Sequence, residues 1–132
     1  MGLCACLALH VADEALTGFL AVYNPIVRSL RVRFPFLPLP TFTFGVWLAG
    51  LVLGVCVLLS LSVFAFRGAR WMVPLALLFG TLMLFNGLAH IGGSIYLGRL
   101  MPGVYSAPLL LAGSVYLGVA AAHYRASLKQ IS

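Results

Sequence analysis

The sequence predicts an all-α membrane protein, a bundle of four transmembrane helices, and two observations carry this prediction. Of the 132 residues, 63% are hydrophobic and only 8% are charged, which is more apolar surface than a soluble domain of this size could bury. The apolar residues also form long unbroken runs, whereas transmembrane strands are short and alternate in polarity. We therefore expect a single transmembrane domain over residues 1–132, surrounded by membrane lipid.

Four apolar runs are long enough to cross a bilayer, because about 20 helical residues span its hydrocarbon core. They cover approximately residues 3–23, 43–66, 71–97 and 104–124. Asn24-Pro25 is expected to end the first run. The proline-rich stretch 34–40 cannot form a regular helix, so we expect either an interfacial loop or a cap over the mouth of the bundle.

The net charge of +6 does not indicate nucleic-acid binding. The basic residues lie between or after the apolar runs, where their side chains can reach lipid headgroups. One side of the membrane would carry Arg28, Arg31, Arg33 and Arg99, and the other Arg67, Arg70, Arg125 and Lys129. This tie leaves the orientation open and is compatible with a homodimer, for which Gly50 and Gly54 would offer a small-residue face.

The only two acidic residues of the chain are adjacent, in His10-Val11-Ala12-Asp13-Glu14 within the first run. On a helix His10, Asp13 and Glu14 fall at positions i, i+3 and i+4 and share one face. A carboxylate inside a membrane span is costly, about 2.5–3.5 kcal/mol on insertion scales. Its placement therefore indicates a task such as binding a cation, moving a proton or acid/base chemistry.

The third run supplies a matching polar stripe, with Asn86, His90 and Ser94 at four-residue intervals. The first and third runs point in the same direction, so depths can be counted back from their shared exit. Glu14 and His90 each lie about 13 Å inside that boundary at the helical rise of 1.5 Å per residue. The sequence thus predicts a metal site of His10, Asp13, Glu14 and His90, with the ligand chemistry of zinc or non-haem iron.

Two other interpretations of these residues compete with the metal site. The first is bis-histidine haem. Counting residues back from the shared exit places His10 roughly 6 Å deeper than His90, and this offset disfavours haem between them. His123, the third histidine, lies near the membrane interface. A purely structural interpretation pairs Asp13 or Glu14 with His90 or Arg99, although buried ion pairs are a weak source of stability.

These residues resemble a known family. The His10-x-x-Asp13-Glu14 motif, His90 in a later run and the stretch 99–107, Arg-Leu-Met-Pro-Gly-Val-Tyr-Ser-Ala, are similar to the small bacterial membrane proteins named for an HXXEE motif. The sequence departs from that pattern at Asp13, where the family has Glu. The resemblance implies a four-span helical domain in the bacterial cytoplasmic membrane with functional His and acidic positions, and it implies no particular reaction.

The leading functional hypothesis is a metal-dependent or acid/base membrane enzyme that acts on a lipophilic small molecule. Its expected catalytic residues are Asp13, Glu14, Asn86 and His90, and its expected substrate contacts are Ser94 and Arg99. Two alternatives stay open at this point. One is an oligomeric proton- or cation-coupled transport protein, and the other is an accessory membrane subunit whose polar cluster is structural.

Overall fold

The computed structural model describes residues 1–131, and within that range it contains five helices and no strand, which confirms the all-α class. The helices are α1 (Gly2–Thr17), α2 (Phe19–Arg33), α3 (Phe44–Phe66), α4 (Met72–Leu97) and α5 (Ala107–Ile131).

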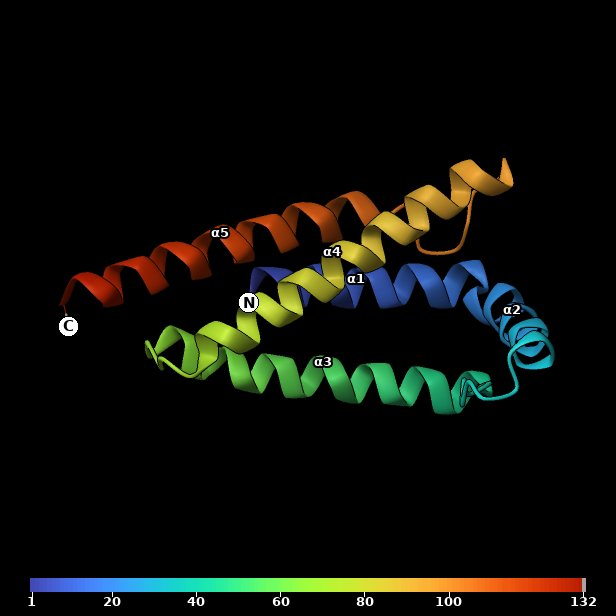
Figure 1. Cartoon of the computed structure of the whole chain (residues 1–132), viewed down its shortest axis with the longest axis horizontal. Coiled ribbons are helices and arrows are strands. Elements are labelled where there is room, and N and C mark those ends of the chain that lie inside the picture. Colours follow the sequence, from blue (N-terminus) through green and yellow to red (C-terminus); the bar gives the residue numbers. More distant parts are fainter. Residues whose placement is uncertain (132) are drawn as a thin grey trace.

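Four of these helices lie side by side, and α2 lies across one end of the group (Figure 1). α4 packs most extensively against α5, and α1 packs against both α3 and α5. The two chain termini lie toward the same end of the molecule, opposite the end at which α2 lies. This is the arrangement that four membrane spans in an up-and-down order would produce.

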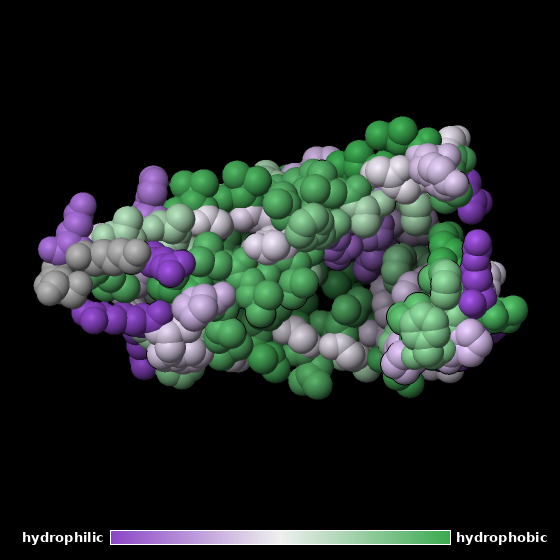
Figure 2. Space-filling model, in the orientation of Figure 1, coloured by the Kyte–Doolittle hydropathy of each residue, from purple (hydrophilic) through white to green (hydrophobic). Residues whose placement is uncertain are grey.

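The helix surfaces are those of a membrane protein. α3, α4 and residues 107–128 of α5 are each long and apolar enough to cross a bilayer, and the bent pair of α1 and α2 makes a fourth candidate span. Large apolar side chains such as Leu53, Leu78 and Leu82 are exposed on the middle of the helices. Figure 2 shows hydrophobic residues over the middle of one face and hydrophilic residues gathered at its two ends, as expected for a molecule immersed in lipid.

The first predicted span is wrong in its end point. α1 ends at Thr17 rather than Tyr23, because Gly18 adopts the left-handed conformation (φ 78°) and its N–H bonds the carbonyl of Glu14. α2 begins at the next residue at an angle of 81° to α1. Glycine takes this conformation without the steric cost of a Cβ. Asn24-Pro25, the expected stop, lies inside α2.

The proline-rich segment 34–43 folds back along α2. The Asn24 side chain donates to the carbonyl of Phe42 (2.9 Å) and accepts from its N–H (3.1 Å). Farther along α2, the Arg31 guanidinium donates to the carbonyl of Leu39 (2.5 Å). These bonds satisfy backbone groups that prolines leave unpaired in a segment without regular structure, and they fix α2 beside the beginning of α3.

Glycines bring α4 and its neighbours close together. A Cβ at Gly87 would lie 2.9 Å from the Leu111 side chain, so only glycine permits this separation of α4 and α5. Gly93 receives the Met101 side chain in the same way. Gly50 and Gly54, the suggested dimer face, have no heavy atom near an added Cβ among the described residues and remain open toward lipid.

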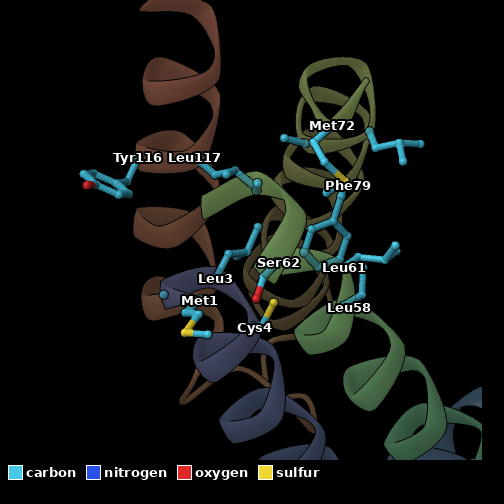
Figure 3. Close-up of a pocket in the computed structure, with 14 residues that line it drawn as sticks. Met1, Leu3, Cys4, Leu58, Leu61, Ser62, Met72, Phe79, Tyr116 and Leu117 are labelled. Carbon is cyan, nitrogen blue, oxygen red and sulfur yellow. The ribbon is translucent and has the colours of Figure 1, made fainter. Parts of the chain in front are cut away.

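At the end of the bundle where the N-terminus lies, α1, α3, α4 and α5 surround an apolar pocket of about 140 Å³ (Figure 3). Its lining includes Cys4, Ser62, Met72 and Leu117, one from each helix. Beyond it, Leu3, Leu7, Val11 and Leu110 form the buried core of the protein. This core separates the pocket from the polar residues near the other end of α1.

Replacing Gly18 with alanine should destabilise the protein by about 1–2 kcal/mol, because a residue with a Cβ is strained at positive φ. Thermal unfolding in detergent, followed by circular dichroism, would measure this as a lower melting temperature. The control is Gly45→Ala, since Gly45 lies within α3 with open space around it, and there alanine should leave the melting temperature unchanged or raise it. A Gly18→Ala protein that melts at or above the wild-type temperature would contradict the assigned break.

Candidate metal centre

Three buried side chains converge from two helices. His10 and Glu14 lie one turn apart on α1, and His90 comes from the second half of α4. Glu14 Oε1 lies 3.1 Å from His90 Nε2 and 3.7 Å from His10 Nε2. The residues are only 0%, 6% and 5% exposed, in the order His10, Glu14, His90. Their ligand atoms all lie within 4.8 Å of one another, a grouping that could hold a metal ion.

The two histidines lie at the same level, so the predicted offset between them is wrong. Their rings meet edge to face with centroids 4.7 Å apart. The depth of His10 was counted back from Tyr23 as the expected end of the first helix, but that helix ends at Thr17. His10 and His90 therefore each lie seven residues before the end of their helix. Rings in direct contact leave no room for a porphyrin between them, which gives a different reason to disfavour haem.

Backbone geometry fixes the tautomer of His90. Its Nδ1 lies 2.6 Å from the carbonyl oxygen of Pro102, which can only accept a hydrogen bond, so Nδ1 carries a proton. In the neutral ring the lone pair is then on Nε2, the atom that faces Glu14. A carbonyl that holds the distal nitrogen in this way is the usual support of a metal-ligating histidine.

His10 is held by a relay of two further side chains. Ser106 donates its hydroxyl proton to Asp13 Oδ2 (2.8 Å), and the same oxygen of Asp13 accepts the Ser106 N–H (2.9 Å). The Ser106 hydroxyl oxygen therefore accepts from His10 Nδ1 at 2.8 Å. This leaves the lone pair of His10 on Nε2. Among the residues that the structure describes, His10 Nε2 is the one buried side-chain nitrogen or oxygen without a hydrogen-bond partner.

Gly103 forms the floor beneath both rings. It adopts a left-handed conformation (φ 85°), and a Cβ there would lie 2.9 Å from the rings of His10 and His90. Glycine is therefore required at this position for two reasons: its backbone conformation is left-handed, and the two rings leave no space for a Cβ. The short connection between α4 and α5 is shaped to let the two imidazoles touch.

The structure separates the other predicted site residues from this group of three. Asp13 bonds Ser106 at the start of α5, where the positive end of the helix dipole favours a carboxylate. Ser94 donates to the carbonyl of His90 (2.7 Å) and accepts the N–H of Met101 (2.9 Å), so it anchors the loop. Asn86 is half-buried one turn before His90 and has no side-chain hydrogen bond to the described residues. Arg99 lies exposed in the loop.

Three residues of the site were not assigned roles by sequence reasoning, namely Pro102, Gly103 and Ser106. All three belong to the stretch 99–107 that supported the family resemblance. Its Pro-Gly pair and the serine preceding the start of α5 are the signals that could have found them. Gly103 and Ser106 contact residues of α1 more than ninety positions earlier, and Pro102 bonds His90 of α4, so no local pattern reports these contacts.

A hollow of about 320 Å³ leads to the buried carboxylate. It lies in the elbow between α1 and α2 and against the beginning of α3, and Glu14, Asn24, Phe42 and Trp47 are among its lining residues. Figure 2 shows hydrophilic residues recessed in the otherwise apolar middle of one face, with a hollow beside them between α1 and α3. Glu14 is therefore both a member of the His/Glu/His group and a wall of a cavity.

Comparison with known proteins gives one result. The family model described as "Protein of unknown function with HXXEE motif" matches residues 1–117, a range that contains the whole site. This confirms the family resemblance. Neither the curated proteins nor the solved structures give a match.

Gly103→Ala should destabilise the protein more than Gly98→Ala. Both residues have positive φ, but a Cβ at Gly98 meets open space, whereas one at Gly103 collides with two buried rings. The shared backbone strain is about 1–2 kcal/mol, and overpacking should add about 1–3 kcal/mol at Gly103 only. Melting temperatures of the two variants in detergent measure the difference. Equal losses would show that Gly103 is needed for its backbone alone.

Proposed function

The chain belongs to the HXXEE family, and we propose that it is a membrane enzyme that holds a divalent metal ion at His10, Glu14 and His90 and acts on a lipophilic small molecule. The observation that carries this proposal is the convergence of two Nε2 lone pairs on one carboxylate oxygen, with His10 Nε2 left unpaired. A buried polar atom without a partner is costly and calls for an explanation. A cation between the three atoms supplies one.

The donor set fits such an ion. Two imidazoles and one carboxylate are the ligands of catalytic zinc in several hydrolases and of non-haem iron(II) in oxygenases. Ligand atoms around a tetrahedral zinc ion at 2.0–2.1 Å lie about 3.3 Å from one another. The distances of 3.1 and 3.7 Å from Glu14 Oε1 to the two Nε2 atoms bracket this value. The Nδ1 atoms of His90 and His10 donate to the Pro102 carbonyl and the Ser106 hydroxyl, respectively. Both rings therefore present the lone pair of Nε2 to the ion.

A metal ion at this position would polarise an oxygen-bearing group or lower the pKa of a bound water. The residues of the chain have separable roles around it. His10, Glu14 and His90 hold the ion, and Asp13 with Ser106 orients His10. Glu14 also contacts whatever occupies the adjoining hollow, because it lines that hollow. The mostly apolar and aromatic lining supports a lipophilic reactant that reaches the site from the bilayer.

The enzyme interpretation is favoured over the two alternatives. A transport path through the bundle would have to pass the buried core of Leu3, Leu7, Val11 and Leu110, which packs between the site and the N-terminal end. A purely structural cluster would be expected to satisfy every buried polar atom, whereas His10 Nε2 has no partner. The position of the hollow, beside the site and toward lipid, suits a reactant that enters laterally.

Protein purified in detergent after metal-replete expression should contain about one equivalent of zinc, iron or manganese, since three converged ligands bind such ions tightly. Elemental mass spectrometry measures this. Glu14→Gln and His90→Ala should each lower the content about tenfold or more because each removes a ligand.

The matched control is His123→Ala, because His123 lies exposed near the end of α5 and its loss should leave the metal content unchanged. Circular dichroism on every variant separates loss of metal from loss of fold. A wild-type protein without metal, or an equal loss in His123→Ala, would overturn the proposal.

Ser106→Ala should weaken Zn²⁺ binding about 10–100-fold, the range found when a residue that orients a metal ligand is removed. The substitution deletes the bond that fixes the His10 tautomer and leaves all three ligands in place. Ser114→Ala is the control, since Ser114 is also buried on α5 but bonds only the carbonyl of Leu110. Competition with a fluorescent chelator measures both affinities. Unchanged affinity in a folded Ser106→Ala protein would contradict the relay.

A further inference from the structure

Two arginines line one hollow at the end of the bundle where the chain termini lie (Figure 1). The hollow has a volume of about 280 Å³ and is formed by α4, α5 and the turn that precedes α4. Arg70 comes from that turn, and Arg125 comes from the second half of α5. The remaining lining is apolar and consists of Val73, Pro74, Leu77 and Leu128. This combination of two cations with an apolar wall lies far from the metal centre and needs its own explanation.

A hydrogen bond beside the arginines holds the two sides of the hollow together. The hydroxyl of Tyr124, the neighbour of Arg125, donates to the carbonyl of Gly68 (2.7 Å) in the turn between α3 and α4. Gly68 is left-handed (φ 70°), and an added Cβ would lie 3.2 Å from that hydroxyl. The end of α5 is therefore tied to the turn that carries Arg70, and the hollow between them is part of the folded protein.

The two positive charges of this hollow have no acidic side chain to pair with. The only acidic residues of the chain are Asp13 and Glu14. Asp13 bonds Ser106, and Glu14 faces the two histidines, near the other end of the bundle. Two like charges that share one hollow repel each other, whereas an anion between them is attracted by both. The charges therefore favour an anionic occupant.

The hollow lies at the membrane boundary and extends toward the bilayer interior. α4 begins two residues after Arg70, and the part of α5 that can cross a membrane ends at Leu128, three residues after Arg125. Trp71, next to Arg70, is exposed, and tryptophan is typical of the depth of lipid headgroups. From Arg70 to Leu77 the lining follows α4 for about 10 Å, at 1.5 Å per residue. The hollow is thus cationic at headgroup depth and apolar toward the acyl chains.

We propose that this hollow binds one anionic glycerophospholipid, such as phosphatidylglycerol. Its phosphate accepts hydrogen bonds from Arg70 and Arg125, because the forked guanidinium group matches phosphate oxygens. One acyl chain follows Val73 and Leu77 along α4. A choline or ethanolamine headgroup would bring a further cation into a hollow that already holds two, so zwitterionic phospholipids are disfavoured. The site is separate from the metal centre and does not depend on the proposed function.

Native mass spectrometry of the full-length protein, delipidated in a non-ionic detergent, measures the binding as phosphatidylglycerol is added. One equivalent should bind about tenfold more tightly than phosphatidylcholine with the same acyl chains, because only the choline lipid adds a cation. Arg70→Gln and Arg125→Gln should each weaken binding about tenfold, since each removes a charge-assisted hydrogen bond to phosphate. Leu77→Trp should also weaken it, because the indole fills the space that the acyl chain needs.

Arg67→Gln and Leu78→Trp are the matched controls. Arg67 is exposed just before the same turn, and Leu78 is exposed next to Leu77 on α4, but neither residue lines the hollow. Both variants should keep the affinity for phosphatidylglycerol within about twofold of wild type, as surface substitutions usually do. Circular dichroism on every variant verifies that the helices are retained.

Any of four results would overturn the inference. The first is equal affinity of the wild-type protein for phosphatidylglycerol and phosphatidylcholine, a comparison that needs no variant. The second is unchanged binding in the double variant Arg70→Gln/Arg125→Gln, and the third is an equal loss in the two controls. The fourth is displacement of the lipid by an equal concentration of glycerophosphoglycerol, the same headgroup without acyl chains, which would indicate a simple anion site.

Discussion

The rest of the structure depends on the need to accommodate one carboxylate and two imidazoles inside a membrane-embedded bundle. Glu14 Oε1 lies between His10 and His90, and an apolar solvent offers no other partner for these groups. Three elements hold them. α1 supplies two of the side chains, α4 the third, and the connection to α5 supplies the carbonyl and hydroxyl that orient both rings. The helices are joined by polar bonds here and by apolar packing elsewhere.

The supporting residues explain why the motif needs two adjacent acids. Glu14 faces the histidines, whereas Asp13 faces the beginning of α5 and accepts two hydrogen bonds from Ser106. One carboxylate is therefore a member of the His/Glu/His group, and the other controls a histidine through a serine. The shorter Asp at this position, where the family motif has Glu, is matched to a partner in direct contact. The two acids are adjacent in sequence and carry out different tasks because successive helical positions point about 100° apart.

The bend at Gly18 links this group to the membrane. Had α1 continued straight to Tyr23, the space beside Glu14 would have been lined by one helix, and α2 could not have crossed the end of the bundle. The turn of 81° instead places Phe19 against Trp47 of α3 and opens the hollow between them. A single left-handed glycine thus ends a helix close to the site, and the bend opens a hollow beside Glu14.

The sequence by itself determined the helical class, the apolar runs that became α3 and α4, and the identities of His10, Glu14 and His90, because burying ionisable groups in lipid is costly enough to mark them without structural information. It did not determine the end of the first helix, since a glycine and an Asn-Pro pair compete as stop signals and the local pattern favours the wrong one. Nor could it assign Pro102, Gly103 and Ser106, whose roles are contacts with side chains of α4 and α1 outside their own loop. Only the tertiary structure decided which of the two acids faces the histidines and that the two imidazole rings lie at one level. Both outcomes depend on where α1 ends. They also depend on how closely Gly87 and Gly103 let α4, α5 and their connecting loop approach one another.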